Sequence, residues 1–108
     1  MNVLFVCSRN RLRSPTAEAL FSDRDGIQTL SAGTAPDAET PLSAELVEWA
    51  EIIFAMETIH RRRIEQHFGG AFPRKRIIVL GIPDKYSYMD PKLVELLLRK
   101  VAPFLRAS

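Results

Sequence analysis

Short apolar runs alternate along this chain with segments of helical periodicity, and this alternation limits the folds open to it. Each apolar run is bounded by glycine, proline or polar residues, as short buried strands are. The runs cover residues 3–6, 27–30, 52–56 and 77–82. Segments with apolar side chains at helical spacing separate them, at 15–23, 42–50 and 58–68. Strands that alternate with helices predict a parallel sheet with right-handed crossovers and helices on both of its faces.

The last helix is the best defined by its ends. Asp90 is a good N-cap, Pro91 suits the first helical position, and Pro103 is expected to end the helix. Together with the preceding elements, this helix completes an α/β fold with a four-stranded parallel sheet, in which we expect the order 2-1-3-4. The length of 108 residues fits a single domain spanning 1–108 and leaves no room for a second one.

The first strand leads directly into a loop that is suited to binding an anion. The run 3–6 reads as a strand buried on both faces, and Ser14-Pro15 reads as a helix start. Backbone N–H groups in a loop between a strand and a helix N-terminus form a concave site that favours a tetrahedral oxyanion. In sheets of this kind ligands bind outside the carboxyl ends of the strands. The expected phosphate-binding loop consists of Cys7, Ser8, Arg9, Asn10, Arg11, Leu12, Arg13 and Ser14.

Two residues of this loop carry reactive or phosphate-binding chemistry. Cys7 is the only cysteine of the chain, and Arg13 follows it by six positions. Loop N–H groups, the helix N-terminus and the guanidinium would all favour the thiolate, which is the nucleophilic form. Arg13 could hold two phosphate oxygens bidentately. The pair predicts phosphoryl transfer to sulfur followed by hydrolysis, and the alternative is that Cys7 is only a small buried hydrophobic residue.

Composition sets the expected surroundings of the protein. No apolar run approaches the length of a membrane span, no signal peptide is recognisable, and one cysteine cannot form an internal disulfide, so we expect a cytoplasmic protein. The net charge is +2, with a basic stretch at 60–76 that lacks the interleaved aromatic residues of a single-strand-binding surface. His60 and His67 have no partners at metal spacing, and we take them as surface or helix-end residues. No metal or cofactor is expected.

The stretch from Val3 to Ala19, with its core Cys7-Ser-Arg-Asn10-Arg-Leu-Arg13-Ser14-Pro15, resembles the nucleophile loop of low-molecular-weight protein tyrosine phosphatases. The pattern of that family is Cys-x-Gly-Asn-x-Cys-Arg-Ser-Pro. Weaker similarities follow at 31–34, 51–56 and 82–84. The resemblance implies the three-layer, flavodoxin-like fold of these phosphatases and hydrolysis of phosphotyrosine in proteins or of small aryl phosphates, with inorganic phosphate or other oxyanions also bound in the loop.

The resemblance also implies roles for individual residues. Cys7 would be the nucleophile, Arg13 would bind phosphate, Ser14 would stabilise the thiolate and Asn10 would brace the loop. The family uses an aspartate before the last helix as general acid, and Asp84 fits this position better than does Asp90, whose helix-capping place explains it without catalysis. Tyr86 and Tyr88 are candidates for the wall of the substrate pocket, where they would stack on an aryl group, or for anchors of their own loop.

Departures from the family pattern limit this carry-over. Arg9 replaces the loop glycine, which puts the loop geometry in doubt, although Arg9 and Arg11 could instead add positive charge that favours acidic substrates. Leu12 replaces the second cysteine, so a protective disulfide cannot form. The chain is also shorter than typical members, through loss of a helix between the second and third strands and of a loop before Asp84.

Three functions are compatible with this sequence. The favoured one is a cysteine-dependent phosphatase that uses Cys7, Arg13 and Asp84. A non-catalytic phosphate- or RNA-binding module is the alternative, which Arg9 and the basic stretch 60–76 allow. Arsenate reduction on the same fold is disfavoured, because its thioredoxin-coupled form relays electrons through further cysteines that this chain lacks.

Overall fold

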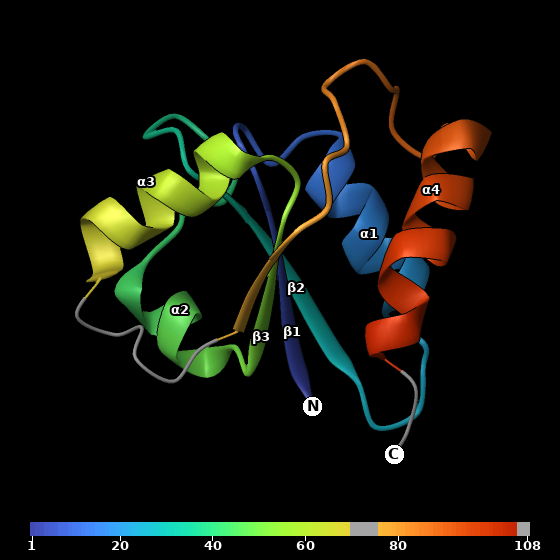
Figure 1. Cartoon of the computed structure of the whole chain (residues 1–108), viewed down its shortest axis with the longest axis horizontal. Coiled ribbons are helices and arrows are strands. Elements are labelled where there is room, and N and C mark those ends of the chain that lie inside the picture. The colour runs from blue at the N-terminus through green and yellow to red at the C-terminus, as the bar shows by residue number, and fades with distance from the viewer. Residues whose placement is uncertain (70–75, 106–108) are drawn as a thin grey trace.

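The chain folds around one parallel sheet (Figure 1). This computed structural model describes residues 1–69 and 76–105, so Arg74 and Lys75 of the basic stretch lie outside the described residues. The strands are β1 (Asn2–Cys7), β2 (Gln28–Gly33), β3 (Ile52–Ala55) and β4 (Arg76–Val79). The helices are α1 (Arg13–Phe21), α2 (Ala44–Trp49), α3 (Thr58–Phe68) and α4 (Pro91–Val101), with a 3-10 turn η2 (Ala102–Phe104) after α4. All strand pairs are parallel, and the order β2-β1-β3-β4 confirms the predicted topology.

Helices cover both faces of the sheet, with α1 and α4 on one side and α2 and α3 on the other (Figure 1). Phe5 of β1 stacks between Phe21 and Phe54 on the first side, with ring centroids 5.9 and 5.4 Å apart. Leu4 of the same strand faces the second side and belongs to the other apolar cluster. Because β1 is buried on both faces, as predicted, its carboxyl end at Cys7 is fixed by packing.

The start of α1 differs from the prediction. The helix begins at Arg13, so Ser14 is not its N-cap and Pro15 stands at the third helical position. Ser14 does not cap because its hydroxyl contacts Cys7 and Asn10 instead. A proline is tolerated there because the N–H groups of the first turn have no partner within the helix. The α4 prediction is confirmed, since Asp90 accepts a hydrogen bond from the Lys92 N–H at 2.9 Å and Pro91 follows it.

The apolar run 77–82 is only partly a strand. Regular β4 ends at Val79, but the N–H groups of Leu80 and Ile82 still donate to the carbonyls of Ala55 and Met56, each at 2.9 Å. This extension alongside β3 carries the chain to Asp84 at the carboxyl edge of the sheet. Among the described residues, no helix is long and apolar enough to cross a membrane.

Candidate active site

The loop between β1 and α1 forms one wall of a cavity of about 450 Å³ at the carboxyl edge of the sheet. Asp84, which follows the extension of β4, reaches the same cavity from a distant part of the chain. The lining residues are Cys7, Ser8, Arg9, Arg11, Leu12, Arg13 and Asp84. The structure therefore brings together the residues that the sequence singles out for nucleophile, phosphate binding and general acid.

The sulfur of Cys7 is surrounded by hydrogen-bond donors. The Asn10 N–H donates to Cys7 Sγ at 3.3 Å, and the Ser14 hydroxyl lies 2.9 Å from the sulfur. Asn10 Nδ2 donates to Ser14 Oγ at 2.9 Å, which leaves the Ser14 hydroxyl hydrogen free to point at the sulfur. Donors of this kind stabilise a thiolate, and all three side chains are buried.

Arg13 is held rigidly although it is a long, charged side chain. Only 2% of the residue is exposed. Its Nη1 donates to Glu57 Oε1 at 2.5 Å and to the Ile82 carbonyl at 2.7 Å, and its Nε lies 3.7 Å from Asp84 Oδ1. In the described part of the chain, Nη2 has no protein hydrogen-bond partner, so this nitrogen is available to a ligand. A guanidinium that is oriented before binding loses less entropy when it binds an oxyanion.

The replacement of the loop glycine by Arg9 leaves this loop intact. The left-handed conformation falls on Asn10, with φ of 57°, and not on Arg9. A small residue is required opposite the loop instead. A Cβ atom on Gly33 of β2 would lie 2.5 Å from the Ser8 carbonyl oxygen and 2.5 Å from Ala38 Cβ. The doubt that the sequence raises at Arg9 is therefore unfounded, and the close approach that needs glycine occurs at Gly33.

The two rim arginines are less free than the sequence suggests. Arg9 Nη1 lies 2.7 Å from Asp37 Oδ2, and Arg11 Nε lies 3.4 Å from Glu39 Oε1. All four side chains are more than half exposed. The positive charge at the mouth of the cavity is therefore balanced by acids from the segment after β2, which weakens the expectation that these arginines select acidic substrates.

The remaining candidates lie apart from the cavity. Its lining includes neither Tyr86 nor Tyr88. Tyr86 packs against the apolar cluster beneath α1 and α4, and Tyr88 is exposed. Asp90 caps α4. Of the two aspartates considered as general acid, only Asp84 lines the cavity.

His60 lies in the first turn of α3, which agrees with the helix-end expectation, but it is buried and not at the surface. The residue is 0% exposed, its Nε2 lies 2.9 Å from Ser8 Oγ, and its Nδ1 accepts a hydrogen bond from the Glu57 N–H at 3.0 Å. Burial, helped by the nearby charge of Arg13, lowers the pKa of His60 from 6.5 to about 4. Glu57 and His60 form a capping box, in which each side chain accepts a hydrogen bond from the backbone N–H of the other residue. Because glutamate is a rare N-cap, the sequence does not indicate this capping box. His67, in contrast, is exposed as expected.

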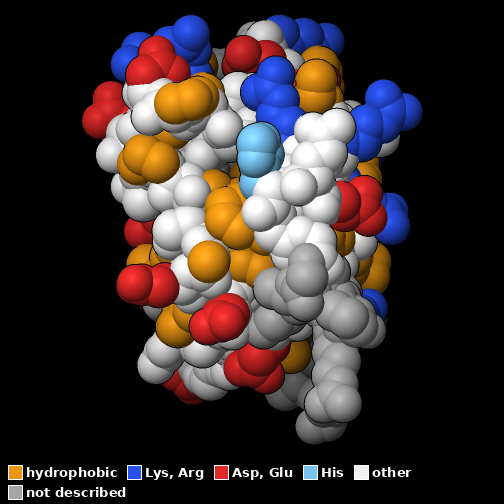
Figure 2. Space-filling view, turned by 90° about the vertical axis from the view of Figure 1, so that its left-hand side faces the viewer, with side chains coloured by type: hydrophobic (Ala, Val, Ile, Leu, Met, Phe, Trp, Pro, Cys, Tyr) orange, Lys and Arg blue, Asp and Glu red, His pale blue; other side chains and the backbone are white. Residues whose placement is uncertain are grey.

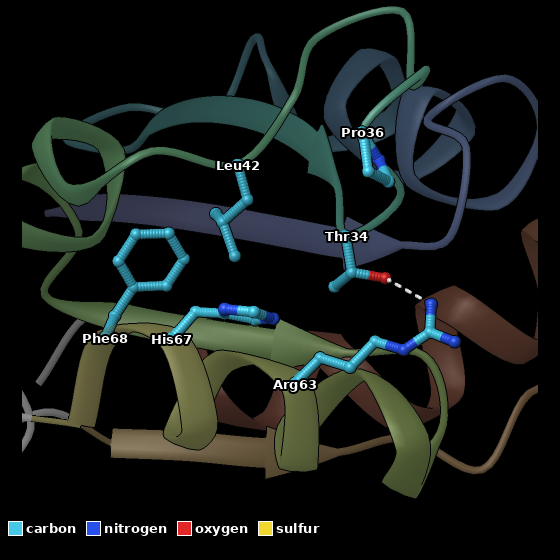
Figure 3. Close-up of a pocket in the computed structure, with 6 residues that line it drawn as sticks. All are labelled: Thr34, Pro36, Leu42, Arg63, His67 and Phe68. Carbon is cyan, nitrogen blue, oxygen red and sulfur yellow. Dashed lines mark hydrogen bonds between the residues drawn. The ribbon is translucent and has the colours of Figure 1, made fainter.

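A second pocket, of about 340 Å³, lies between α3 and the segment after β2 (Figure 3). Its lining residues are Thr34, Pro36, Leu42, Arg63, His67 and Phe68. Figure 2 shows apolar side chains gathered in a hollow on this face of the molecule. The Arg63 guanidinium donates to Thr34 Oγ1 at 3.4 Å, and the pocket shares no lining residue with the cavity at Cys7.

Known proteins similar to this chain are phosphatases. A protein-arginine-phosphatase of Bacillus subtilis (strain 168) is 32% identical over 96 residues, and the match covers 64% of that protein. The match thus spans just under two thirds of this curated relative. No protein-family model matches the sequence.

Solved structures with the same fold extend over nearly the whole chain. The YwlE arginine phosphatase, in a variant with a phosphorylated active-site serine, is 28% identical with a TM-score of 0.74 and covers 97% of this chain and 95% of its own. The tyrosine phosphatase Wzb from Escherichia coli K30, in complex with phosphate, is 21% identical with a TM-score of 0.75, covering 95% and 94%. These likenesses confirm the fold, and they agree with the resemblance of the sequence to low-molecular-weight protein tyrosine phosphatases.

Proposed function

We propose that this protein is a cysteine-dependent phosphatase that removes phosphoryl groups from protein side chains through a phosphocysteine intermediate. The observation that carries the proposal is the meeting of Cys7, Arg13 and Asp84 around one cavity. The phosphorylated active-site serine in the YwlE structure supports it, because that residue carries the phosphoryl group that a nucleophile would receive.

In the first step, the Cys7 thiolate attacks phosphorus. A sulfur–phosphorus bond forms while the bond from phosphorus to the leaving group breaks, and the Asp84 carboxyl group gives its proton to the leaving atom. Arg13 Nη2 and the N–H groups of the loop bind the phosphoryl oxygens, on which charge is spread in the transition state. The hydrogen bonds from Asn10 and Ser14 stabilise the sulfur as an anion before attack.

In the second step, water hydrolyses the intermediate. The Asp84 carboxylate takes a proton from the water as it attacks phosphorus, the sulfur–phosphorus bond breaks, and inorganic phosphate leaves. The same hydrogen bonds that stabilise the Cys7 thiolate make it a better leaving group in this step.

Phosphoarginine is the substrate class that we favour over phosphotyrosine. The relatives that share the most identity with this chain among those described above are arginine phosphatases. Among the described residues that line the cavity none is aromatic, so none of them could stack on the phenol ring of phosphotyrosine. The Asp84 carboxylate lines the cavity, where it would attract a guanidinium product once it has given up its proton. The protein would act in the cytoplasm, where its single cysteine would stay reduced.

Turnover by the purified protein tests this proposal. Phosphoarginine and phosphotyrosine peptides of the same sequence should both be assayed for phosphate release, with Cys7→Ser as the inactive control. We expect release by the wild type, faster from phosphoarginine, and loss of at least about 1,000-fold in Cys7→Ser. Equal rates for wild type and Cys7→Ser would exclude the mechanism, and faster release from phosphotyrosine would reverse the substrate assignment.

The general acid is tested by a matched pair of variants. Asp84→Asn should slow release from both peptides by about 100-fold, because the amide cannot protonate the leaving group. Asp90→Asn should have a much smaller effect, since asparagine is also a good N-cap. A larger loss in Asp90→Asn than in Asp84→Asn would show that Asp84 is the wrong residue. Phosphate or RNA binding without any turnover would favour the non-catalytic alternative.

A further inference from the structure

The mechanism above does not use His60, although it is completely buried in the first turn of α3 and touches the phosphate-binding loop. A buried imidazole needs partners for both ring nitrogens, and each nitrogen of His60 has one. Glu57 N–H donates to Nδ1, and Ser8 Oγ lies 2.9 Å from Nε2.

These contacts fix where the protons are. Because Nδ1 accepts a hydrogen bond from a backbone N–H, the hydrogen of the neutral ring must be on Nε2. The ring is neutral in the physiological range, since burial lowers the pKa of His60 to about 4. Nε2 therefore donates to Ser8 Oγ, and the Ser8 hydroxyl keeps its own hydrogen for another acceptor.

Ser8 itself lines the cavity that contains Cys7 and Arg13. Within residues 1–69 and 76–105, the Ser8 hydroxyl has no hydrogen-bond partner other than His60 Nε2. We propose that the Ser8 hydroxyl donates a hydrogen bond to an oxygen of the bound phosphoryl group, and that His60 is a positioning residue that aims it. This inference rests on the proposed function, because it assigns a further binding contact to the same site.

The first turn of α3 also orients Arg13, the other phosphate-binding side chain of the site. The Glu57 carboxylate binds both the backbone of His60, as part of the capping box, and the Arg13 guanidinium. The first turn of α3 therefore orients two phosphate-binding groups, Arg13 through Glu57 and Ser8 through His60. A capping box that only began a helix would not need its histidine side chain to contact the loop.

Affinity for inorganic phosphate tests the inference without requiring turnover. Binding should be measured by titration calorimetry at neutral pH, together with kcat and KM where turnover occurs. We expect Ser8→Ala to weaken phosphate binding by about tenfold, as loss of a hydrogen bond to a charged ligand does. A wild type that binds phosphate but shows no turnover would refute the proposed function and still permit this test.

Two substitutions of His60 separate its two contacts. In His60→Asn, the amide oxygen can replace Nδ1 as acceptor of the Glu57 N–H but the side chain is too short to reach Ser8. This variant should keep its thermal stability near that of the wild type and bind phosphate about tenfold more weakly. In His60→Gln, the amide N–H can reach the place of Nε2, and phosphate binding should be largely restored.

The double variant Ser8→Ala/His60→Asn shows whether His60 acts through Ser8. We expect it to bind phosphate no more weakly than Ser8→Ala alone, because the two losses concern one contact. His67→Asn on the same helix is the control and should bind like the wild type. Wild-type phosphate affinity in Ser8→Ala, or independent multiplying losses in the double variant, would overturn the inference.

Discussion

The loop between β1 and α1, with the residues that flank it, has an inner and an outer part that differ in burial and in the number of hydrogen bonds they share. The inner part is buried and shares hydrogen bonds among its members, and it consists of Cys7, Asn10, Arg13 and Ser14. The outer part is exposed, and its charged side chains Arg9 and Arg11 each meet one exposed acid.

Two arginines show what this difference means. Arg13 and Arg9 carry the same side chain and each pairs with a carboxylate at short distance. However, a buried guanidinium with several fixed acceptors is oriented before a ligand arrives, whereas an exposed ion pair is screened by water and contributes little. We therefore expect the inner part to control chemistry and the outer part to adjust affinity for the rest of the substrate.

The same substitution, arginine to lysine, should affect catalysis very differently at Arg13 and at Arg9, and this is the largest difference that we expect between the two parts. Arg13→Lys should lower kcat/KM for a phosphopeptide by about 100-fold or more, because lysine cannot replace the planar fork that binds phosphoryl oxygens. Arg9→Lys should change it by less than about fivefold, as is typical of exposed ion pairs. Steady-state kinetics on both variants is the measurement. Comparable losses of kcat/KM would show that the exposed outer part contributes as much to catalysis as the buried inner part.

Acid stability probes the buried side of the loop through His60. Its pKa is lowered from 6.5 to about 4 in the folded protein, so the unfolded chain binds the extra proton more readily between these values. The stabilisation is complete above about pH 6.5 and is lost as the pH falls through 4. Denaturant unfolding should therefore show stability falling by about 3 kcal/mol over this range.

His67 provides the matched control for that titration. His60→Gln should flatten the loss of stability between pH 6.5 and 4, whereas His67→Gln, at an exposed position on the same helix, should leave it unchanged. If the His67 variant changed the pH dependence as much as the His60 variant, the buried imidazole would not be its source.

A smaller effect is expected where β2 supports the loop from behind. Gly33→Ala should destabilise the protein by about 2 kcal/mol and weaken phosphate binding, because the added Cβ would meet the Ser8 carbonyl and Ala38 at 2.5 Å. Gly69→Ala is the control, since a Cβ there meets no atom of the described residues within 4 Å. Phosphate titration and thermal unfolding of both variants give the answer; a Gly33 variant that behaves like the Gly69 variant would contradict the close approach.

Periodicity was sufficient for most of the fold. Strand β1 and helix α4 were predicted well because burial on both faces and a capped amphipathic pattern leave strong local signals. The start of α1 was missed because Ser14 looks like an N-cap in sequence, while in the structure its hydroxyl serves the Cys7 sulfur. The capping rule failed at Ser14 because its hydroxyl group is used in the hydrogen bonding of the candidate site and not at the helix end.

The candidate site divides in a similar way. Cys7 and Arg13 could be located from the sequence because one short loop contains both. The support from Glu57, His60 and Gly33 could not, because it depends on how β2 and α3 pack against that loop. His60 in particular gave no pattern that distinguishes a buried hydrogen-bonded histidine from one on a helix surface.

The most direct test of the account is to look for the phosphoryl group on Cys7. Wild-type protein that is turning over a phosphoarginine peptide should be quenched rapidly and digested, and its peptides examined by mass spectrometry. We predict a phosphoryl group on the peptide that contains Cys7, with more of it in a variant such as Asp84→Asn if that change slows hydrolysis more than attack. Phosphate release by active enzyme with the phosphoryl group on another residue, or on none throughout the time course, would contradict the account.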